Sequence, residues 1–317
     1  MALKVVALVG GVGGAKLADG LARLLPPDNL TVVVNTADDF KHLGLHISPD
    51  LDTVIYTLAG LAHPQRGWGR ADESWNFLET LRTLGGPDWF QLGDKDLALH
   101  IERTRRLARG ETLSQITANL ASRLGVKPRV LPMSDDPVRT VVLTEDGELP
   151  FQTYFVARRC EPRVRGFRFE GAEHARPAPG VLEALREADW VVLGPSNPWV
   201  SLDPILAVPG LREEVRARAV CGVSPILGGR ALKGPAAKMF AELGVQPSAL
   251  AVAGHYADLL QLFAIDELDR SLAAEIEALG VQTLVIDIRM PDATARARVA
   301  RSLLDSMAER VQGEGVV

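Results

Sequence analysis

Cysteine is scarce in this chain. The 317 residues include two, Cys160 and Cys221, and their separation matches no metal-binding spacing. We therefore expect reduced thiols in a cytoplasmic protein. Basic residues are not in excess either, because 35 Lys and Arg stand against 40 Asp and Glu, giving a formal net charge of -5. This balance argues against a nucleic-acid-binding protein, which needs a basic surface to follow the phosphates.

The chain also lacks a long apolar run. Residues 5–9 (VVALV) are apolar, but this run is too short to span a bilayer or to form the core of a signal peptide, so we expect no membrane association. Hydrophobic residues make up 47% and charged residues 24% of the chain, which is typical of globular proteins and argues against extended disorder. The length predicts one large α/β domain with insertions, or two lobes.

The first 34 residues predict the opening of a nucleotide-binding fold. A buried strand is expected at 5–9, a glycine turn at 10–14, a helix from Lys16 to Leu25, and a second buried strand at 30–34. This order begins a doubly wound, Rossmann-like α/β sheet whose strands are mostly parallel. The alternation of helices and strands returns after about residue 180, where the second half of the sheet is expected.

The middle of the chain interrupts this alternation. Helices are expected there at 76–85, 95–109 and 112–124, and strands at 129–132, 139–144 and 151–156. Further strands are expected later, at 190–193, 219–223, 250–253 and 283–286. The predicted domains are a nucleotide-binding core of residues 1–62 and 179–317, and an inserted, largely helical segment of residues 63–178 with a small β part.

The glycine turn after the first strand predicts a phosphate site. Backbone N–H groups at the start of a helix bind phosphate oxygens well, and Lys16 adds a cation to the first turn. The residues expected to bind a nucleotide are Gly11, Val12, Gly13, Gly14 and Lys16. The match to known fingerprints is partial, because Ala15 interrupts a Walker loop and Lys16 replaces the third glycine of the dinucleotide pattern. A tight turn without a ligand is the alternative.

Aspartates cluster after the second strand. Asp38 and Asp39 follow it directly, and Asp50 and Asp52 come after Pro49, where an extended turn would point both carboxylates to one side. Four carboxylates at the carboxyl edge of a parallel sheet suit Mg²⁺, which prefers oxygen ligands. Two alternatives stay open: an acid that holds an adenosine ribose, and aspartates that cap helices.

Histidines and other loops add weaker signals. His42 and His46 are four residues apart, which permits zinc, but no third ligand is suitably spaced, so a surface or supporting role is favoured. Ser196 and Asn197 follow the strand expected at 190–193 and could donate to phosphate or to a base. Lys233 lies in another strand-end loop and could meet phosphate. Trp68, Trp75 and Trp89 could stack on a planar ring, although core packing is the usual fate of Trp.

Taken in order, the motifs resemble the 2-phospho-L-lactate transferase family (CofD-like) of coenzyme F-420 biosynthesis. The resemblance spans nearly the whole chain. The matching segments are GGVGGAK (10–16), NTADD (35–39), PDLDT (49–53), GWG (67–69), LGDKD (92–96), LPMSDDP (131–137), GPSNP (194–198) and SPI (224–226).

This resemblance implies a transferase that moves a phospholactyl or phosphoenolpyruvyl group from a guanosine-diphosphate-linked donor to the ribityl hydroxyl of the deazaflavin FO, with release of GMP. It implies Mg²⁺ held by Asp38, Asp39, Asp50 and Asp52, and a homodimer. Asp52 is expected to orient the acceptor hydroxyl or take its proton, with Asp39 as a second catalytic acid. Acceptor contacts are expected from Asp52, Gln91 and Trp89, and the 63–178 segment is expected to cover this site. Gln91 departs from relatives that carry lysine.

Two other functions remain as alternatives. A related branch of the superfamily binds UDP-sugars and acts as a regulator without transfer chemistry, and it shares the glycine turn and the Asp-Asp pair. The PDLDT segment and the Trp-rich middle segment favour the transferase. An NAD-dependent dehydrogenase is less favoured, because the third fingerprint glycine is missing.

Overall fold

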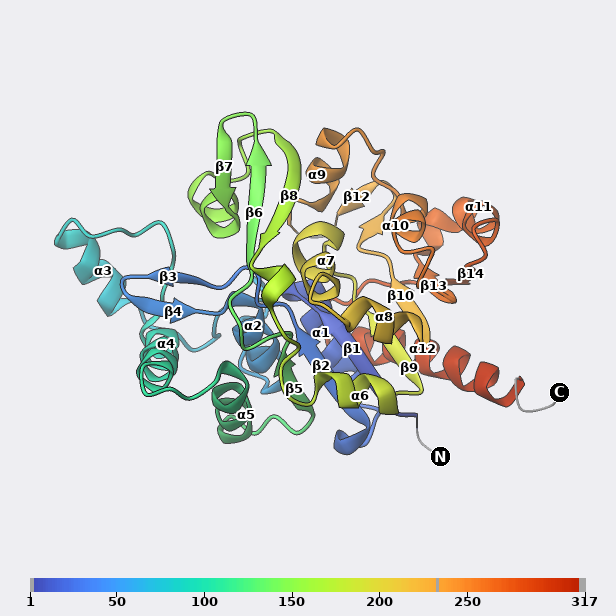
Figure 1. The fold of residues 1–317 in the computed structure, drawn as a ribbon, viewed down its shortest axis with the longest axis horizontal. Coiled ribbons are helices and arrows are strands. Elements are labelled where there is room, and N and C mark those ends of the chain that lie inside the picture. The colour runs from blue at the N-terminus through green and yellow to red at the C-terminus, as the bar shows by residue number, and fades with distance from the viewer. Residues whose placement is uncertain (1–2, 232–233, 314–317) are drawn as a thin grey trace.

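A seven-stranded parallel sheet forms the centre of the molecule (Figure 1). The structure is a computed structural model that describes residues 3–231 and 234–313. The strands run in the order β14-β13-β10-β9-β1-β2-β5, and every pairing is parallel. Their bounds are β1 Val5–Val9, β2 Leu30–Val34, β5 Arg129–Pro132, β9 Trp190–Leu193, β10 Ala219–Val223, β13 Leu262–Ile265 and β14 Gln282–Val285. The predicted α/β fold with a doubly wound parallel sheet is confirmed.

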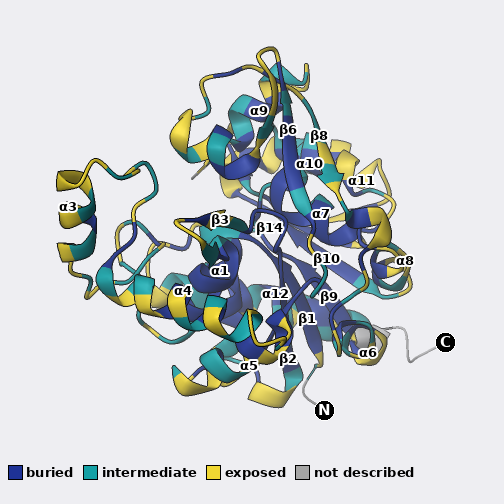
Figure 2. Cartoon of the chain, turned by 60° about the vertical axis from the view of Figure 1, so that its left-hand side comes forward, coloured by how far each residue is buried: buried dark blue, intermediate teal, exposed yellow. Residues whose placement is uncertain are grey.

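Helices cover both faces of the sheet, because its strands are apolar on both sides. Along β1, Val5, Ala7 and Val9 pack into one core, whereas Val6 and Leu8 pack into the other. The first face is covered by α1 Gly11–Ala22, α2 Pro49–Leu58, α5 Leu113–Arg123 and α12 Ala293–Gly313. The second is covered by α6 Val181–Glu187, α7 Asp203–Leu206, α8 Leu211–Arg216, α9 Ala236–Glu242, α10 Ala249–His255 and α11 Ala273–Glu277. Figure 2 shows the strands as the most buried part of the molecule.

The strand order reverses at β1. From β1 the chain continues outward through β2 and β5, whereas β9, β10, β13 and β14 extend to the other side. The turns after β1 and β9 therefore lie side by side, at the point where open α/β sheets usually bind ligands.

Smaller elements surround this edge. An arm formed by α3 Asn76–Thr83 projects from one side and is followed by α4 Asp94–Leu107 (Figures 1 and 2). An antiparallel sheet has the order β7-β6-β8, with β6 Arg139–Thr144, β7 Gly147–Pro150 and β8 Val164–Glu170. Two hairpins are formed by β3 Phe40–His42 with β4 Leu45–Ile47, and by β11 Ile226–Leu227 with β12 Arg230–Ala231. Short helical turns complete the chain: η1 Pro27–Asn29, η2 Thr153–Ala157, η3 Ala172–His174, η4 Pro198–Leu202 and η5 Glu267–Leu272.

Two expected strands are helical in the structure. Residues 250–253 lie in α10, because the Ser248 hydroxyl accepts from the N–H of Ala251 and caps an alanine-rich segment. The strand of the main sheet comes later, as β13. The hairpin around Asp146 is confirmed, but its second strand is β7, and most of the expected strand 151–156 lies in the helical turn η2.

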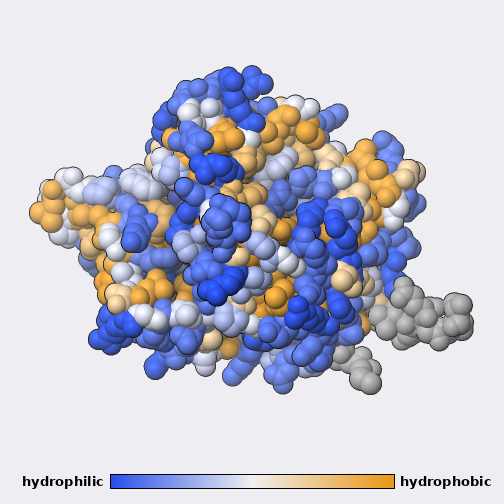
Figure 3. Space-filling view, viewed as in Figure 1, coloured by the Kyte–Doolittle hydropathy of each residue, from blue (hydrophilic) through white to orange (hydrophobic). Residues whose placement is uncertain are grey.

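The segment 63–178 also contributes to the main sheet. Its strand β5 pairs with β2, and α5 packs on the sheet just before it. Residues 113–132 therefore complete the parallel α/β sheet, although the sequence places them in the insertion. In the space-filling view, hydrophilic residues cover most of the visible face (Figure 3). Among the described residues, no helix is long and apolar enough to cross a membrane.

Candidate functional site

The glycine turn forms the first turn of α1 rather than a loop before it. Gly10 is the N-cap, and Gly11 begins the helix with a φ of 63°, a left-handed conformation that favours glycine. The Ser196 hydroxyl accepts from the Gly10 N–H at 3.1 Å and donates to the Gly10 carbonyl at 2.8 Å. Ser196 therefore joins the turns after β1 and β9, and its hydroxyl hydrogen is engaged by the protein itself.

Close packing of these two turns explains the second pair of glycines. A Cβ on Gly13 would lie 2.4 Å from the Pro195 carbonyl oxygen, and one on Gly14 would lie 2.6 Å from the Ser196 hydroxyl oxygen. Such contacts are far shorter than van der Waals distance. The glycines therefore let two strand ends meet, whether or not phosphate is bound.

Replacing Gly13 by alanine is expected to lower the free energy of unfolding by about 2 kcal/mol, because the methyl group must displace backbone atoms. Urea unfolding would measure this. Gly254→Ala is the matched control, since that glycine lies in α10 and an added Cβ would meet no atom within 4 Å beyond its chain neighbours and the backbone of its own helix. The control should be neutral or slightly stabilising. Equal losses in both variants would contradict the packing explanation.

Asn35 is the centre of a buried acidic group at the end of β2. Its side-chain nitrogen lies 3.3 Å from Asp38 Oδ1 and 3.0 Å from Asp50 Oδ2, and its oxygen accepts from the Ala37 N–H. Asp50 Oδ1 accepts from the N–H of Gly11 at 2.7 Å. One asparagine therefore gathers two acids against the N-terminus of α1.

The acids in this group carry an excess of negative charge. Burial raises the pKa of Asp38 well above its ordinary value, and the charges of Asp50 and Asp39 raise it further. Burial raises the pKa of Asp50 to about 6. Asp39 Oδ2 accepts from Ser48 and lies 3.0 Å from His46 Nε2, but its buried Oδ1 has no hydrogen-bond partner in the described part of the chain. A bare carboxylate oxygen beside two further acids fits a hard divalent cation.

The raised pKa of Asp50 predicts a pH-dependent stability in the absence of divalent cations. The unfolded chain ionises this group near 3.8 and the native protein near 6, so the native state binds more protons between these values. The free energy of unfolding therefore falls as pH rises through this window, by about 3 kcal/mol from this group. Urea unfolding in EDTA should show a steeper fall in the wild type than in Asp50→Asn. If the free energies of unfolding of the two proteins fell in parallel with pH, the raised pKa of Asp50 would be contradicted.

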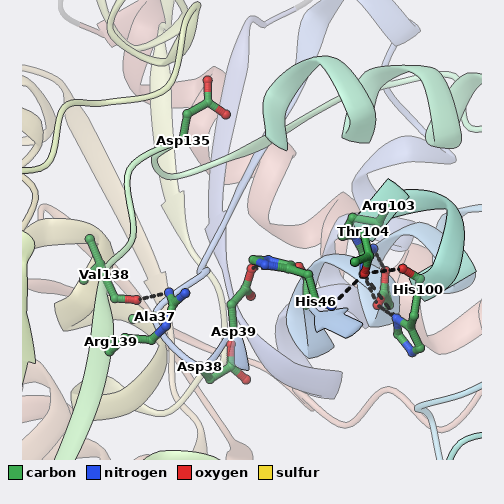
Figure 4. Close-up of polar contacts among 12 residues, drawn as sticks. Ala37, Asp38, Asp39, His46, His100, Arg103, Thr104, Asp135, Val138 and Arg139 are labelled. Carbon is green, nitrogen blue, oxygen red and sulfur yellow. Dashed lines mark hydrogen bonds and ion pairs between the residues drawn. The ribbon is translucent and has the colours of Figure 1, made fainter. Parts of the chain in front are cut away.

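Asp52 lies apart from this group. We expected its carboxylate to point to the same side as that of Asp50, from an extended turn, but Pro49 begins α2 and both acids lie in its first turn. Two positions along a helix is a rotation of about 200°, so the side chains diverge. Asp52 instead makes a two-contact ion pair with the buried guanidinium of Arg103 on α4. In Figure 4, Arg103 and His100 lie apart from Asp38 and Asp39.

A second acidic group surrounds this ion pair. Asp52, Asp96 and His100 place one ligand atom each within 4.8 Å of one another, which would permit a metal ion. Arg103 already supplies a cation to Asp52 there, and His100 Nδ1 lies 3.3 Å from Arg103 Nη1. Asp38, Asp39 and Asp50 are therefore the better candidates to hold a metal.

Gln91 lies between α3 and α4 in the chain, beside the arm. It lines a cavity of about 220 Å³ together with Arg66, Trp75, Leu78, Glu79 and Arg82. The Arg66 guanidinium lies over the rings of Trp68 and Trp75, at 5.4 and 5.5 Å. Trp89 does not line this cavity, because its ring packs edge-on against His42 with the centroids 5.1 Å apart.

The other residues that the sequence predicts to bind the nucleotide lie in different environments. Asn197 caps η4 by accepting from the Trp199 N–H, and its amide nitrogen faces Met239. Lys16 lies half-buried on the first turns of α1. Lys233 falls outside the described residues. Val12 is partly exposed at the start of α1.

Sequence reasoning missed three residues that shape the site. Asn35 and Arg103 are described above, and Gln152, which directly precedes η2, donates to Asp38 Oδ2 at 3.0 Å. Asn35 is the first residue of the NTADD segment, so the motif included it, although the sequence alone assigned it no role. Arg103 and Gln152 are 51 and 114 residues from the acids that they contact, and no spacing pattern links them.

Comparisons with known proteins agree with this architecture. The model of the family described as "2-phospho-L-lactate transferase CofD" matches residues 5–303. A "Phosphoenolpyruvate transferase" of Kitasatospora aureofaciens is 44% identical, over 98% of this chain and 99% of that protein. A "2-phospho-L-lactate transferase" of Methanosarcina mazei is 41% identical, over 89% and 93%.

Among solved structures, a UPF0052-family protein of Bacillus halodurans has a TM-score of 0.62 at 18% identity, over 96% of this chain and 99% of that one, which shows the shared fold alone. The family assignment thus rests on the profile match and on the sequence relatives over nearly the whole length. The chain therefore belongs to the 2-phospho-L-lactate transferase CofD family and is a transferase of coenzyme F-420 biosynthesis.

Proposed function

We propose that this enzyme transfers a phosphoenolpyruvyl group from a guanosine-diphosphate-linked donor to the terminal ribityl hydroxyl of the deazaflavin FO, with release of GMP. The observation that carries the proposal is the acidic group at the switch point of the sheet: Asp50 accepts from the Gly11 N–H at the start of α1, and Asn35 joins Asp50 to Asp38. Asp39 belongs to this group because its charge raises the pKa of both Asp38 and Asp50. The enolpyruvyl donor is favoured over the lactyl one because relatives at 43–44% identity are named phosphoenolpyruvate transferases.

The donor diphosphate is assigned to the first turn of α1. The N–H groups of this turn and the positive end of the helix favour an anion, and Lys16 is the sixth residue of the same helix, in its second turn. The turn after β9 forms the neighbouring wall, where Ser196 holds Gly10 in place. Ser196 thus supports the donor site by fixing the turn, rather than by donating to phosphate.

Mg²⁺ is assigned to Asp38, Asp39 and Asp50. Asp39 Oδ1, which has no hydrogen-bond partner in the part of the chain that the structure describes, and the mutual repulsion of the three acids fit a divalent cation. Asp52 is left out of this set, because Arg103 binds both of its oxygens. When bound, the ion would neutralise charge on the diphosphate. Asn35 and Gln152 orient Asp38 for this role.

The acceptor is assigned to the α4 side of the site. The cavity beside Gln91 offers one aromatic wall and two arginines, which suit a planar polar ring system. Asp52 would accept the hydrogen bond of the ribityl hydroxyl and orient its oxygen. Because Trp89 packs on His42 outside this cavity, it would support the β3–β4 hairpin rather than stack on the ring.

The chemistry is a displacement at phosphorus. The ribityl oxygen forms a bond to the phosphorus that carries the three-carbon acid, and the bond from that phosphorus to the bridging oxygen breaks. GMP leaves with the electron pair of that bond, and the hydroxyl proton is released. Charge neutralisation and positioning supply most of the acceleration in such transfers.

Mass spectrometry of the product tests the proposal. Purified enzyme with Mg²⁺ and FO would be given the lactyl, enolpyruvyl and glyceryl forms of the guanylylated donor in separate reactions. The expected product is the enolpyruvyl phosphodiester of FO, with one GMP released for each product formed. Preferential formation of the lactyl or glyceryl product would overturn the donor assignment. Absence of any FO phosphodiester would overturn the proposed reaction.

A further inference from the structure

Arg103 is a fully buried cation beside the proposed acceptor site. Its side chain is 1% exposed, and it lies in α4 facing the first turn of α2. We propose that Arg103 is a positioning residue for the acceptor: it holds the Asp52 carboxylate in one orientation for the ribityl hydroxyl. This inference rests on the proposed function, because it assigns a role within the same site.

The geometry of the contact supports a fixed orientation. Arg103 Nη1 donates to Asp52 Oδ2 at 3.1 Å, and Nη2 donates to Oδ1. Two parallel hydrogen bonds from a planar guanidinium allow the carboxylate a single plane, whereas a lysine ammonium would allow rotation. Asp52 therefore has little freedom to swing toward Asp50, which lies in the same helical turn.

The guanidinium is itself held by its surroundings. His100 Nδ1 lies 3.3 Å from Nη1, and Asp96 lies one turn earlier on α4, where it accepts from the Tyr56 hydroxyl at 2.7 Å. Tyr56 belongs to α2, so this hydrogen bond and the ion pair join the same two helices at successive turns. The relative position of α2 and α4 is thus set at Asp52 and again one turn further along α2.

The same helix is tied to the acceptor cavity. The N–H groups of Lys95 and Asp96, in the first turn of α4, donate to the carboxylate of Glu73 at 2.9 and 2.8 Å. Glu73 comes two residues before Trp75, which lines the cavity. Arg103 therefore links the acid proposed to face the hydroxyl with the segment proposed to hold the ring, through a single helix.

Stability alone is a poor reason for this pair. A buried ion pair often contributes no more to folding than apolar side chains of similar volume, because both charges lose their hydration. Arg103 also leaves its Nε buried with no hydrogen-bond partner among the described residues, which costs free energy. A buried Asp52–Arg103 pair that carries these costs at a substrate site is better explained by the orientation that Arg103 imposes on the Asp52 carboxylate.

Steady-state kinetics of Arg103→Met and Arg103→Lys test the inference. Arg103→Met should raise the KM for FO at least tenfold, while the donor KM and the half-saturating Mg²⁺ concentration stay within twofold of the wild type. Arg103→Lys should restore the folding stability but only part of the FO affinity, because an ammonium cannot make the two-contact pair. Arg105→Met is the matched control, since Arg105 lies on α4 in an exposed pair with Glu102, and it should leave all three constants unchanged.

Two results would overturn the inference. One is an unchanged FO KM in a folded Arg103→Lys, with urea unfolding used to establish folding. The other is an equal rise in the donor KM and the Mg²⁺ requirement, which would place Arg103 on the donor side. Calorimetric titration of FO without donor separates this inference from the proposed reaction. If the wild type binds FO but transfers nothing, the proposed reaction fails, and weaker FO binding by Arg103→Lys still supports the positioning role.

Discussion

Asp39→Asn is expected to lower kcat about a thousandfold and to raise the half-saturating Mg²⁺ concentration. The substitution keeps the shape of the side chain but removes the charge of a buried carboxylate whose Oδ1 has no hydrogen-bond partner among the described residues. A divalent cation supplies several kcal/mol of charge stabilisation in phosphoryl transfer, and each 1.36 kcal/mol is tenfold in rate, so losing about 4 kcal/mol gives this factor. Initial rates measured across a Mg²⁺ series would provide both values.

Asp135→Asn is the control for this prediction. Asp135 follows the neighbouring strand β5, but both of its oxygens are already engaged, by the N–H of Ser114 at 2.6 Å and its hydroxyl at 2.7 Å. Its loss should reduce stability and leave the Mg²⁺ requirement unchanged. Should Asp39→Asn keep wild-type turnover at ordinary Mg²⁺ concentrations, the assignment of the cation to this acidic group would be wrong.

The sheet could be predicted from sequence because parallel strands carry their own signal. Buried strands such as Val5–Val9 and Trp190–Leu193 are short continuous apolar runs, and glycine or proline follows each of them. The strand expected at 250–253 shows where this signal fails. A run of alanine and valine is apolar in either conformation, and the capping hydroxyl of Ser248 decided for helix.

The sequence predicted that four aspartates lie near one edge of the sheet, but it did not predict how they are grouped there. Pro49 after Ser48 is typical of a helix start, so the divergence of Asp50 and Asp52 was open to prediction from local rules. The partner of Asp52 could not be predicted from local rules, because Arg103 is 51 residues away. In its local sequence, Arg103 is only one more charge on an arginine-rich helix. The packing of α2 against α4 decides that Asp52, and not Asp50, pairs with an arginine of the protein.

Asp52→Asn is expected to lower kcat/KM for the acceptor about a hundredfold and to destabilise the fold. The loss of activity follows from removing the carboxylate that would orient the hydroxyl, a contribution typical of positioned acid–base groups. The loss of stability follows because Arg103 would remain as an uncompensated buried charge, which costs about 3–5 kcal/mol. Kinetics with FO as the varied substrate and urea unfolding would measure the two effects.

The double variant Asp52→Leu with Arg103→Met separates these effects. It removes both buried charges and replaces them with apolar side chains, so most of the folding stability should return. The acceptor kcat/KM should stay as low as in Asp52→Asn, because no carboxylate remains to meet the hydroxyl. If activity returned together with stability, Asp52 and Arg103 would be joining α2 to α4 and nothing more, and the acceptor hydroxyl would have to be oriented by a different group.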